Sequence, residues 1–176
     1  MRFPESAGLR PTPDRVRETL FNWLTNCFGQ DLQGPNCLDL FAGSGALGFE
    51  AASRGASKVV MVENESRAVA ELEANRKILG GEGQLEIVRS DAVKFATLTP
   101  LRFNLLFLDP PYHQGWIARM APLLPRILAE DAIIYAEAEH LLEGCGEWQT
   151  QRHGKAGQVY YHLMQRREPR GDLIDA

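Results

Sequence analysis

Residues 37–52 read CLDLFAGSGALGFEAA and contain the glycine pattern that decides the fold. The apolar run at its start is typical of a buried β-strand, and the segment ALGFEAASR (residues 46–54), which begins within it, is typical of a helix. Between them, residues 43–48 (GSGALG) match the pattern G-x-G-x-x-G of nucleotide-cofactor loops. Gly43 and Gly45 let the backbone approach a ligand closely, and the first turn of the helix offers free N–H groups to an anion. This stretch therefore predicts a ligand-binding strand–loop–helix unit.

The rest of the chain alternates between strand and helix patterns. The expected helices are DRVRETLFNWLTNCF, ESRAVAELEANRKIL and the proline-interrupted WIARMAPLLPRIL; the expected strands are KVVMVE, QLEIVRS, FNLLFLD and AIIYAEA. Two last strands, around Trp148 and in QVYYHLMQ, are expected to form a hairpin that turns between Gly154 and Gly157. This order predicts one α/β domain over residues 1–176, with a Rossmann-like, mostly parallel sheet and an antiparallel C-terminal hairpin. We expect this domain to consist of an entry segment with a helix (1–35), a catalytic core (36–168) and a frayed tail (169–176).

Composition excludes several classes of protein. The 176 residues carry a net charge of −4, so a nucleic-acid partner would need a local basic face. The cysteines Cys27, Cys37 and Cys145 are scattered and odd in number, which argues against a disulfide framework and a metal site and for a reducing cytoplasm. We expect no metal and no membrane contact, because no apolar run is long enough to span a bilayer.

Carboxylates around the glycine loop narrow the choice of ligand. Glu63 ends the second strand 20 residues after Gly43, where a ribose hydroxyl would bind in either NAD or S-adenosylmethionine. Asp39 would repel the pyrophosphate of a dinucleotide but attract the ammonium group of S-adenosylmethionine. Asp91, after the third strand, would accept a hydrogen bond from an adenine amine. The structural alternatives are a capping role for Asp39, a solvated strand end for Glu63 and a helix N-cap for Asp91.

The second motif is DPPY at residues 109–112, directly after the fourth strand. Its two prolines fix the backbone and remove two donors, so that the Asp109 carboxylate and the Pro110 carbonyl remain as acceptors. Two acceptors aimed at an exocyclic amine would orient its lone pair toward a methyl sulfonium without a strong base. Tyr112 would offer a face on which a flipped base stacks. The alternative is a Pro-Pro turn capped by an aspartate.

The segments DLFAGSGALG, VVMVE, SDA and DPPY, in this order, resemble amino methyltransferases that use S-adenosylmethionine. With LRPTPDRVRETLFNWL before them and AGQVYYHL after them, the chain is similar to the bacterial 16S ribosomal RNA guanine-N2 methyltransferases of the RsmD type. The resemblance implies a seven-stranded class I methyltransferase fold. It also implies methylation of one guanine amine in RNA of an assembled, or nearly assembled, small ribosomal subunit.

The resemblance also implies roles for individual residues. Residues 109–112 would form the catalytic loop, with Asp109, Pro110, Pro111 and Tyr112. The cofactor would be bound by Asp39, Phe41, Gly43, Ser44, Gly45, Glu63, Asn64, Asp91, Ala92 and Asp109. The RNA substrate would be contacted by Arg10, Thr12, Arg15 and Tyr112. The arginine cluster has the alternative of a solvated helix start.

One feature departs from the resemblance. Members of the family usually begin with a basic hairpin before RPT, whereas eight residues precede Leu9 here. The basic candidates for RNA are therefore Arg10, Arg15 and Arg17 at the front, and Arg152, Lys155, Arg166, Arg167 and Arg170 at the back.

Other functions remain open from the sequence. An adenine-N6 DNA methyltransferase shares DPPY and the glycine loop, but 176 residues leave little room for a target-recognition region. A nicotinamide oxidoreductase is disfavoured by Asp39, and a non-catalytic RNA-binding module by the intact DPPY. We expect a monomer that acts on 16S ribosomal RNA in the cytoplasm.

Overall fold

The computed structural model describes residues 13–29, 32 and 34–167. Arg10 and Thr12, two of the expected substrate residues, lie outside this range. The first helix, α1 (Asp14–Phe28), has the bounds of the predicted segment DRVRETLFNWLTNCF. Pro13 has an extended ψ of 141° and is the residue before the helix, not its first residue.

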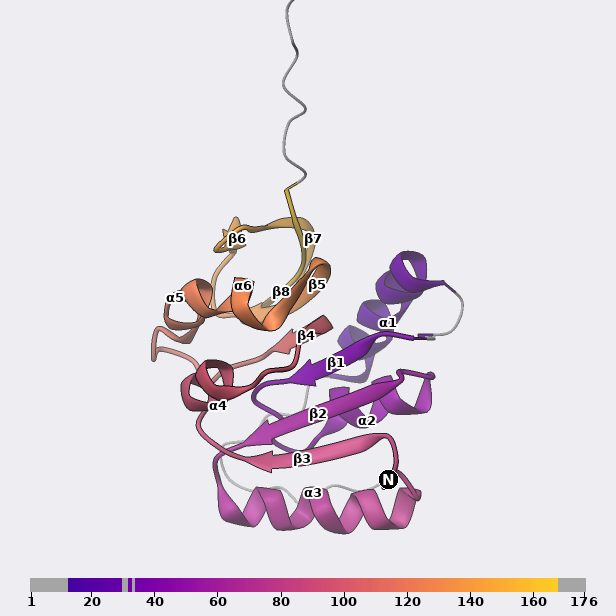
Figure 1. The fold of residues 1–176 in the computed structure, drawn as a ribbon. Coiled ribbons are helices and arrows are strands. Elements are labelled where there is room, and N and C mark those ends of the chain that lie inside the picture. The colour runs from indigo at the N-terminus through magenta and orange to yellow at the C-terminus, as the bar shows by residue number, and fades with distance from the viewer. Residues whose placement is uncertain (1–12, 30–31, 33, 168–176) are drawn as a thin grey trace, which may run out of the picture.

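A single sheet organises the fold, and its strand order is β3-β2-β1-β4-β5-β8-β7-β6 (Figure 1). The first five strands in the chain pair in parallel and the last three in antiparallel fashion. This confirms the Rossmann-like α/β class, with an antiparallel hairpin at the C-terminal side. The strands are β1 (Asn36–Asp39), β2 (Lys58–Glu63), β3 (Leu85–Arg89), β4 (Phe103–Leu108), β5 (Leu128–Ala138), β6 (Gly144–Cys145), β7 (Trp148–Ala156) and β8 (Val159–Arg166).

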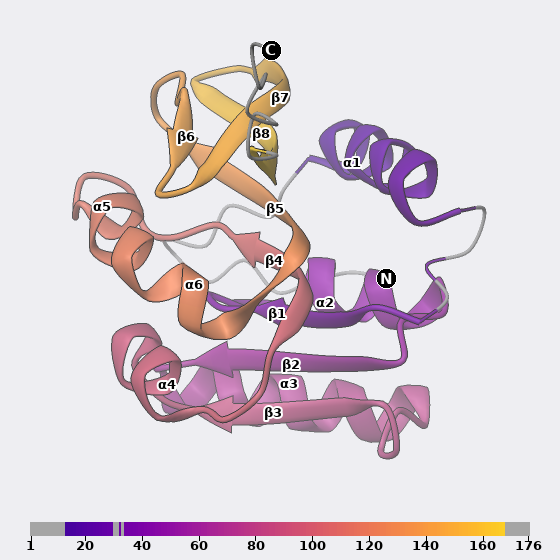
Figure 2. The ribbon, with the colours of Figure 1, turned by 45° about the horizontal axis from the view of Figure 1, so that its top comes forward.

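Helices cover both faces of the sheet (Figures 1 and 2). One core packs α1, α2 (Ala46–Ser53) and α3 (Ser66–Leu79) against the sheet. The other core packs α4 (Ala92–Leu98), α5 (Trp116–Met120) and α6 (Leu124–Ile127) against the opposite face, with a 3-10 turn at Ala121–Leu123. The central strands are therefore buried on both sides, which explains why KVVMVE and FNLLFL are almost continuous apolar runs.

The C-terminal part differs from the sequence-based prediction in three details. The sheet has eight strands instead of seven, because the two-residue β6 pairs with β7. The hairpin turn spans only residues 157–158, and Gly154 lies within β7, where an added Cβ would meet the ring of Tyr161. β5 begins at Leu128, four residues before AIIYAEA, with a register irregularity opposite β4.

No helix in the described part of the chain is long and apolar enough to cross a membrane. Within the same residues, no group of three or more His, Cys, Asp or Glu side chains is placed to hold a metal ion.

Candidate active site

The glycine loop joins the end of β1 to the start of α2. Gly43 and Gly45 adopt left-handed φ values of 53° and 81°, which side chains rarely adopt, and Gly45 is the residue before the first turn of α2. A Cβ on Gly45 would approach side-chain atoms of Leu72 and Phe49 to 2.5 Å. Glycine is therefore needed here both for its backbone conformation and for close packing of the loop.

Glu63 ties the glycine loop to the next strand. Its carboxylate accepts hydrogen bonds from the backbone N–H groups of Gly43 (2.9 Å), Asn64 (2.8 Å) and Glu65 (2.9 Å). These bonds hold the half-buried side chain at the carboxyl end of β2, beside the loop. A carboxylate has about four acceptor positions, so one is left for a further donor, such as a ribose hydroxyl.

Asp39 is a buried carboxyl of the candidate site, with 2% of its surface exposed. Its Oδ2 accepts a hydrogen bond from the backbone N–H of Gly48 in α2, at 3.2 Å. Burial, and to a smaller extent the charge of Glu63, raise the pKa of Asp39 to about 7, against the lowering effect of the Gly48 N–H. The buried carboxyl would be stabilised in its ionised form by a cation and would repel a pyrophosphate.

Asp91 has the helix-capping role that the sequence left as an alternative. Its Oδ1 accepts the backbone N–H of Lys94 at 3.0 Å, at the start of α4, which leaves Oδ2 for another donor. The remaining expected cofactor residues lie around the same edge of the sheet: Phe41 and Ser44 in the glycine loop, Asn64 after β2 and Ala92 at the start of α4.

The DPPY segment follows β4, the strand next to β1 in the sheet. Asp109 shares a side-chain hydrogen bond with Glu137 of β5. Burial, followed by the charges of Glu137 and Asp39, raises the pKa of Asp109 well above its usual range. The expected cofactor carboxylate and the expected catalytic carboxyl are thus close enough to influence each other electrostatically. Pro110 is buried, Pro111 is exposed and Tyr112 is half-buried.

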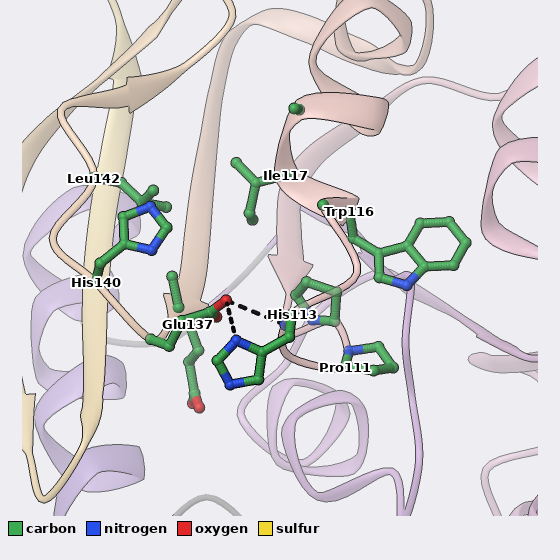
Figure 3. A pocket seen from close by; sticks show the side chains of 12 residues that line it. Pro111, His113, Trp116, Ile117, Glu137, His140 and Leu142 are labelled. Atoms are coloured by element: carbon green, nitrogen blue, oxygen red, sulfur yellow. Dashed lines mark hydrogen bonds and ion pairs between the residues drawn. The ribbon is translucent and has the colours of Figure 1, made fainter.

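A cavity of about 240 Å³ lies beside this loop, between α5 and the end of β5 (Figure 3). Pro110, Pro111, Trp116, Ile117 and Leu142 contribute to its walls. Mostly apolar walls of this kind suit an aromatic or heterocyclic ring.

His113, the residue after DPPY, has a left-handed φ of 62°, an uncommon value for a residue other than glycine. The Glu139 carboxylate holds it in place: Oε1 accepts the backbone N–H of His113 at 3.1 Å and lies 3.5 Å from its ring Nδ1 (Figure 3). The residue that follows DPPY is therefore held to the end of β5 by Glu139.

Arg15 is exposed in the first turn of α1, and Arg17 pairs with Asp14 at 2.7 Å. The expected contact of Arg15 with RNA remains a prediction.

Sequence reasoning missed Glu137, Glu139, His113 and Trp116. Glu137 could have been noticed, since a charged residue within the buried run AIIYAEA is rare unless it has a partner. His113 and Glu139 meet only because β5 runs beside β4, which no local pattern reveals.

Solved structures show the class to which this fold belongs. A methyltransferase structure from Escherichia coli is 41% identical, with a TM-score of 0.81, covering 91% of this chain and 89% of that chain. An RNA methyltransferase of Salinibacter ruber, solved with S-adenosyl-L-homocysteine, shares the fold at 18% identity, with a TM-score of 0.68 and coverage of 95% of this chain and 100% of that chain. The fold is that of class I methyltransferases.

Sequence comparisons then identify the family. The family model described as "Conserved hypothetical protein 95" matches residues 1–165. "Ribosomal RNA small subunit methyltransferase D" of Escherichia coli is 41% identical over 93% of this chain and 82% of its own length. The protein of the same name from Haemophilus influenzae is 38% identical over 91% of this chain and 84% of its own. The chain belongs to this family of methyltransferases.

Part of the chain is also similar to a methyltransferase named for a different substrate. A transfer RNA adenine-N6 methyltransferase of Escherichia coli is 32% identical over 88 residues, which is 49% of this chain and 36% of that protein.

Proposed function

We propose that this protein methylates the exocyclic N2 amine of one guanine in 16S ribosomal RNA of the small subunit, with S-adenosylmethionine as the methyl donor. The observation that carries the proposal is the position of Asp109 at the end of β4, beside Asp39 on the neighbouring strand β1, in a chain of this family. Its relatives are named for ribosomal RNA small-subunit methylation.

The donor set fits S-adenosylmethionine. Asp39 would attract its ammonium group, Glu63 would accept from its ribose hydroxyls, and the loop around Gly43 and Gly45 would bring the backbone close to it. Phe41, Ser44, Asn64, Asp91 and Ala92 would complete the cofactor site. When bound, the cofactor supplies a methyl group on a positively charged sulfur.

The catalytic loop would hold the target amine. Asp109 Oδ and the Pro110 carbonyl would each accept a hydrogen bond from one N–H group of the amine. These two bonds would direct the lone pair of the amine nitrogen toward the methyl group. Pro111 would stiffen the loop, and Tyr112 would stack on the flipped base. A proton must also leave the amine, and Asp109 is the group placed to receive it.

The partial match to an adenine-N6 enzyme supports adenine as the second candidate, since the loop can serve either amine. The deciding test is mass spectrometry of nucleosides after the protein is incubated with labelled S-adenosylmethionine and unmodified small subunits, naked 16S RNA or duplex DNA. We expect N2-methylguanosine from the subunits. N6-methyladenine without any methylguanosine would show that the protein is an adenine-N6 methyltransferase instead.

We expect a single-domain monomer in the cytoplasm, where small subunits are found, with no bound metal. Size-exclusion chromatography with light scattering would test the monomer.

A further inference from the structure

Three side chains form a hydrogen-bonded chain at the carboxyl ends of β4 and β5. The Tyr135 hydroxyl donates to Glu137 Oε1 at 2.7 Å, and Glu137 shares a side-chain hydrogen bond with Asp109. Tyr135 and Glu137 are 0% and 4% exposed. The pairing of Leu108 with Ala136 in the parallel register brings the next residues, Asp109 and Glu137, side by side.

The contact between Asp109 and Glu137 requires a proton. Ionised carboxylates have only acceptors, so two carboxyl groups hydrogen-bond to each other only when one is protonated. The Tyr135 hydroxyl donates to Glu137 and thereby favours the negative charge on that side of the pair. The pair thus carries one proton and one negative charge when no cation is nearby.

Other ionisable groups face this pair from the neighbouring strands. Asp39 on β1 acts electrostatically on Asp109, and Tyr161 on β8 acts on Tyr135. The negative charge of Asp39 favours retention of the shared proton, in agreement with the raised pKa of Asp109. A positive charge brought into this region would have the opposite effect.

On the basis of the proposed function, we propose that Glu137 is a positioning residue. Glu137 shares a proton with Asp109. The pair releases this proton when a sulfonium binds, and it takes up the proton that the target amine loses during methyl transfer.

Charge and atoms balance in this scheme. On binding, the shared proton goes to solvent and the pair becomes doubly negative beside one positive charge. During transfer the N–C bond forms and the S–C bond breaks with its electron pair left on sulfur. The N–H proton moves to Asp109 and is shared with Glu137. The sum of the sulfonium and pair charges is −1 both before and after the step, so no net charge is created in a buried place, where charge is costly.

Calorimetric titration tests the scheme without turnover. S-adenosylmethionine and S-adenosylhomocysteine carry the same ammonium and carboxylate and differ by the sulfonium, so any proton lost from Asp39 cancels in their comparison. Titrations near pH 7 in buffers of different ionisation enthalpy count the protons released. We expect the sulfonium ligand to release roughly one proton more than the thioether from the unsubstituted protein.

Glu137→Gln should reduce this difference to near zero, because an amide cannot share an ionisable proton. Its affinity for S-adenosylhomocysteine should change little, while kcat falls by about a hundredfold. The matched control is Glu86→Gln, an exposed glutamate on β3 that pairs with Lys58, and it should keep the full difference. Circular dichroism checks that each variant is folded.

Tyr135→Phe supplies an independent variant. Without its hydroxyl the pair should hold its proton more tightly, so the rise of kcat with pH should move to higher pH while KM for the RNA stays the same. Equal proton release by both ligands in the unsubstituted protein, or a full difference in Glu137→Gln, would overturn the scheme. Absence of any binding by either ligand would instead overturn the proposed function.

Discussion

The backbone N–H of Gly43 lies 2.9 Å from the carboxylate of Glu63, so a residue that ends β2 holds the loop that follows β1. The same carboxylate accepts from Asn64 and Glu65. Glu63 therefore shapes the glycine loop, and in the proposed cofactor site it would also present an acceptor to a ligand.

Glu63→Ala should weaken cofactor binding more than the loss of a ribose contact alone, because the loop also loses its acceptor. A charge-assisted hydrogen bond contributes roughly 1.5–3 kcal/mol, which corresponds to about a tenfold to hundredfold loss of affinity. Calorimetric titration with S-adenosylhomocysteine measures it, with Glu86→Ala on β3 as the control. An unchanged affinity would remove Glu63 from the cofactor site, and tight binding of NADH would revive the oxidoreductase alternative.

Gly45→Ala should destabilise the fold and abolish cofactor binding. Alanine at a φ of 81° is strained by about 1–2 kcal/mol, and its Cβ would press on Leu72 and Phe49. Gly83→Ala is the matched control, since no atom lies within 4 Å of its added Cβ. Thermal melts should show a lower midpoint for Gly45→Ala alone. Equal midpoints would mean that the loop can open to admit a side chain.

Local patterns were sufficient to predict the parallel sheet, the glycine loop and the position of DPPY, because each strand is a compact apolar run followed by a recognisable turn. The pattern also allowed α2 to be placed at Ala46. Contacts between distant segments could not be predicted in this way. The Glu137–Asp109 pair depends on β5 lying next to β4, and Gly154 reads as a turn residue although it packs against Tyr161 within the hairpin.

Asp109→Ala should separate chemistry from cofactor binding. The cofactor is expected to be held mainly by groups on β1, β2 and β3, so affinity for S-adenosylhomocysteine should change by only a small factor. The rate should fall by about a hundredfold or more, as for the loss of one preorganised electrostatic partner. Single-turnover methylation of small subunits measures it. A near-normal rate would show that Asp109 does not orient the amine.

Asp39 predicts a pH dependence of stability in the ligand-free protein. Its folded pKa of about 7 lies above the ordinary value of 3.8, so the folded state holds a proton that the unfolded state releases between these values. Stability therefore falls as pH rises through this interval, by at most about 1.4 kcal/mol per pH unit from this group. Asp39→Asn keeps an oxygen for the Gly48 N–H and removes the titration.

The melting temperature of Asp39→Asn relative to the unsubstituted protein should accordingly be higher at pH 8 than at pH 5. Subtracting the two proteins at each pH cancels the other titrating groups. A difference that stays constant with pH would contradict the raised pKa.

Arg15 tests whether the start of α1 contacts RNA. It is exposed, whereas the neighbouring Arg17 is partly neutralised by Asp14. Arg15→Ala should lower activity on small subunits several-fold through KM and leave affinity for S-adenosylhomocysteine unchanged. Lys77→Ala, which removes an exposed charge from the last turn of α3, is the control.

The salt dependence of RNA binding gives a second test of Arg15. The chain has a net charge of −4, so it can neutralise few phosphates. The logarithm of RNA affinity should therefore fall with a shallow slope against the logarithm of salt concentration. Loss of Arg15 should reduce that slope by about one if it contacts a phosphate. An identical slope and KM in Arg15→Ala would place the RNA contact elsewhere on the protein.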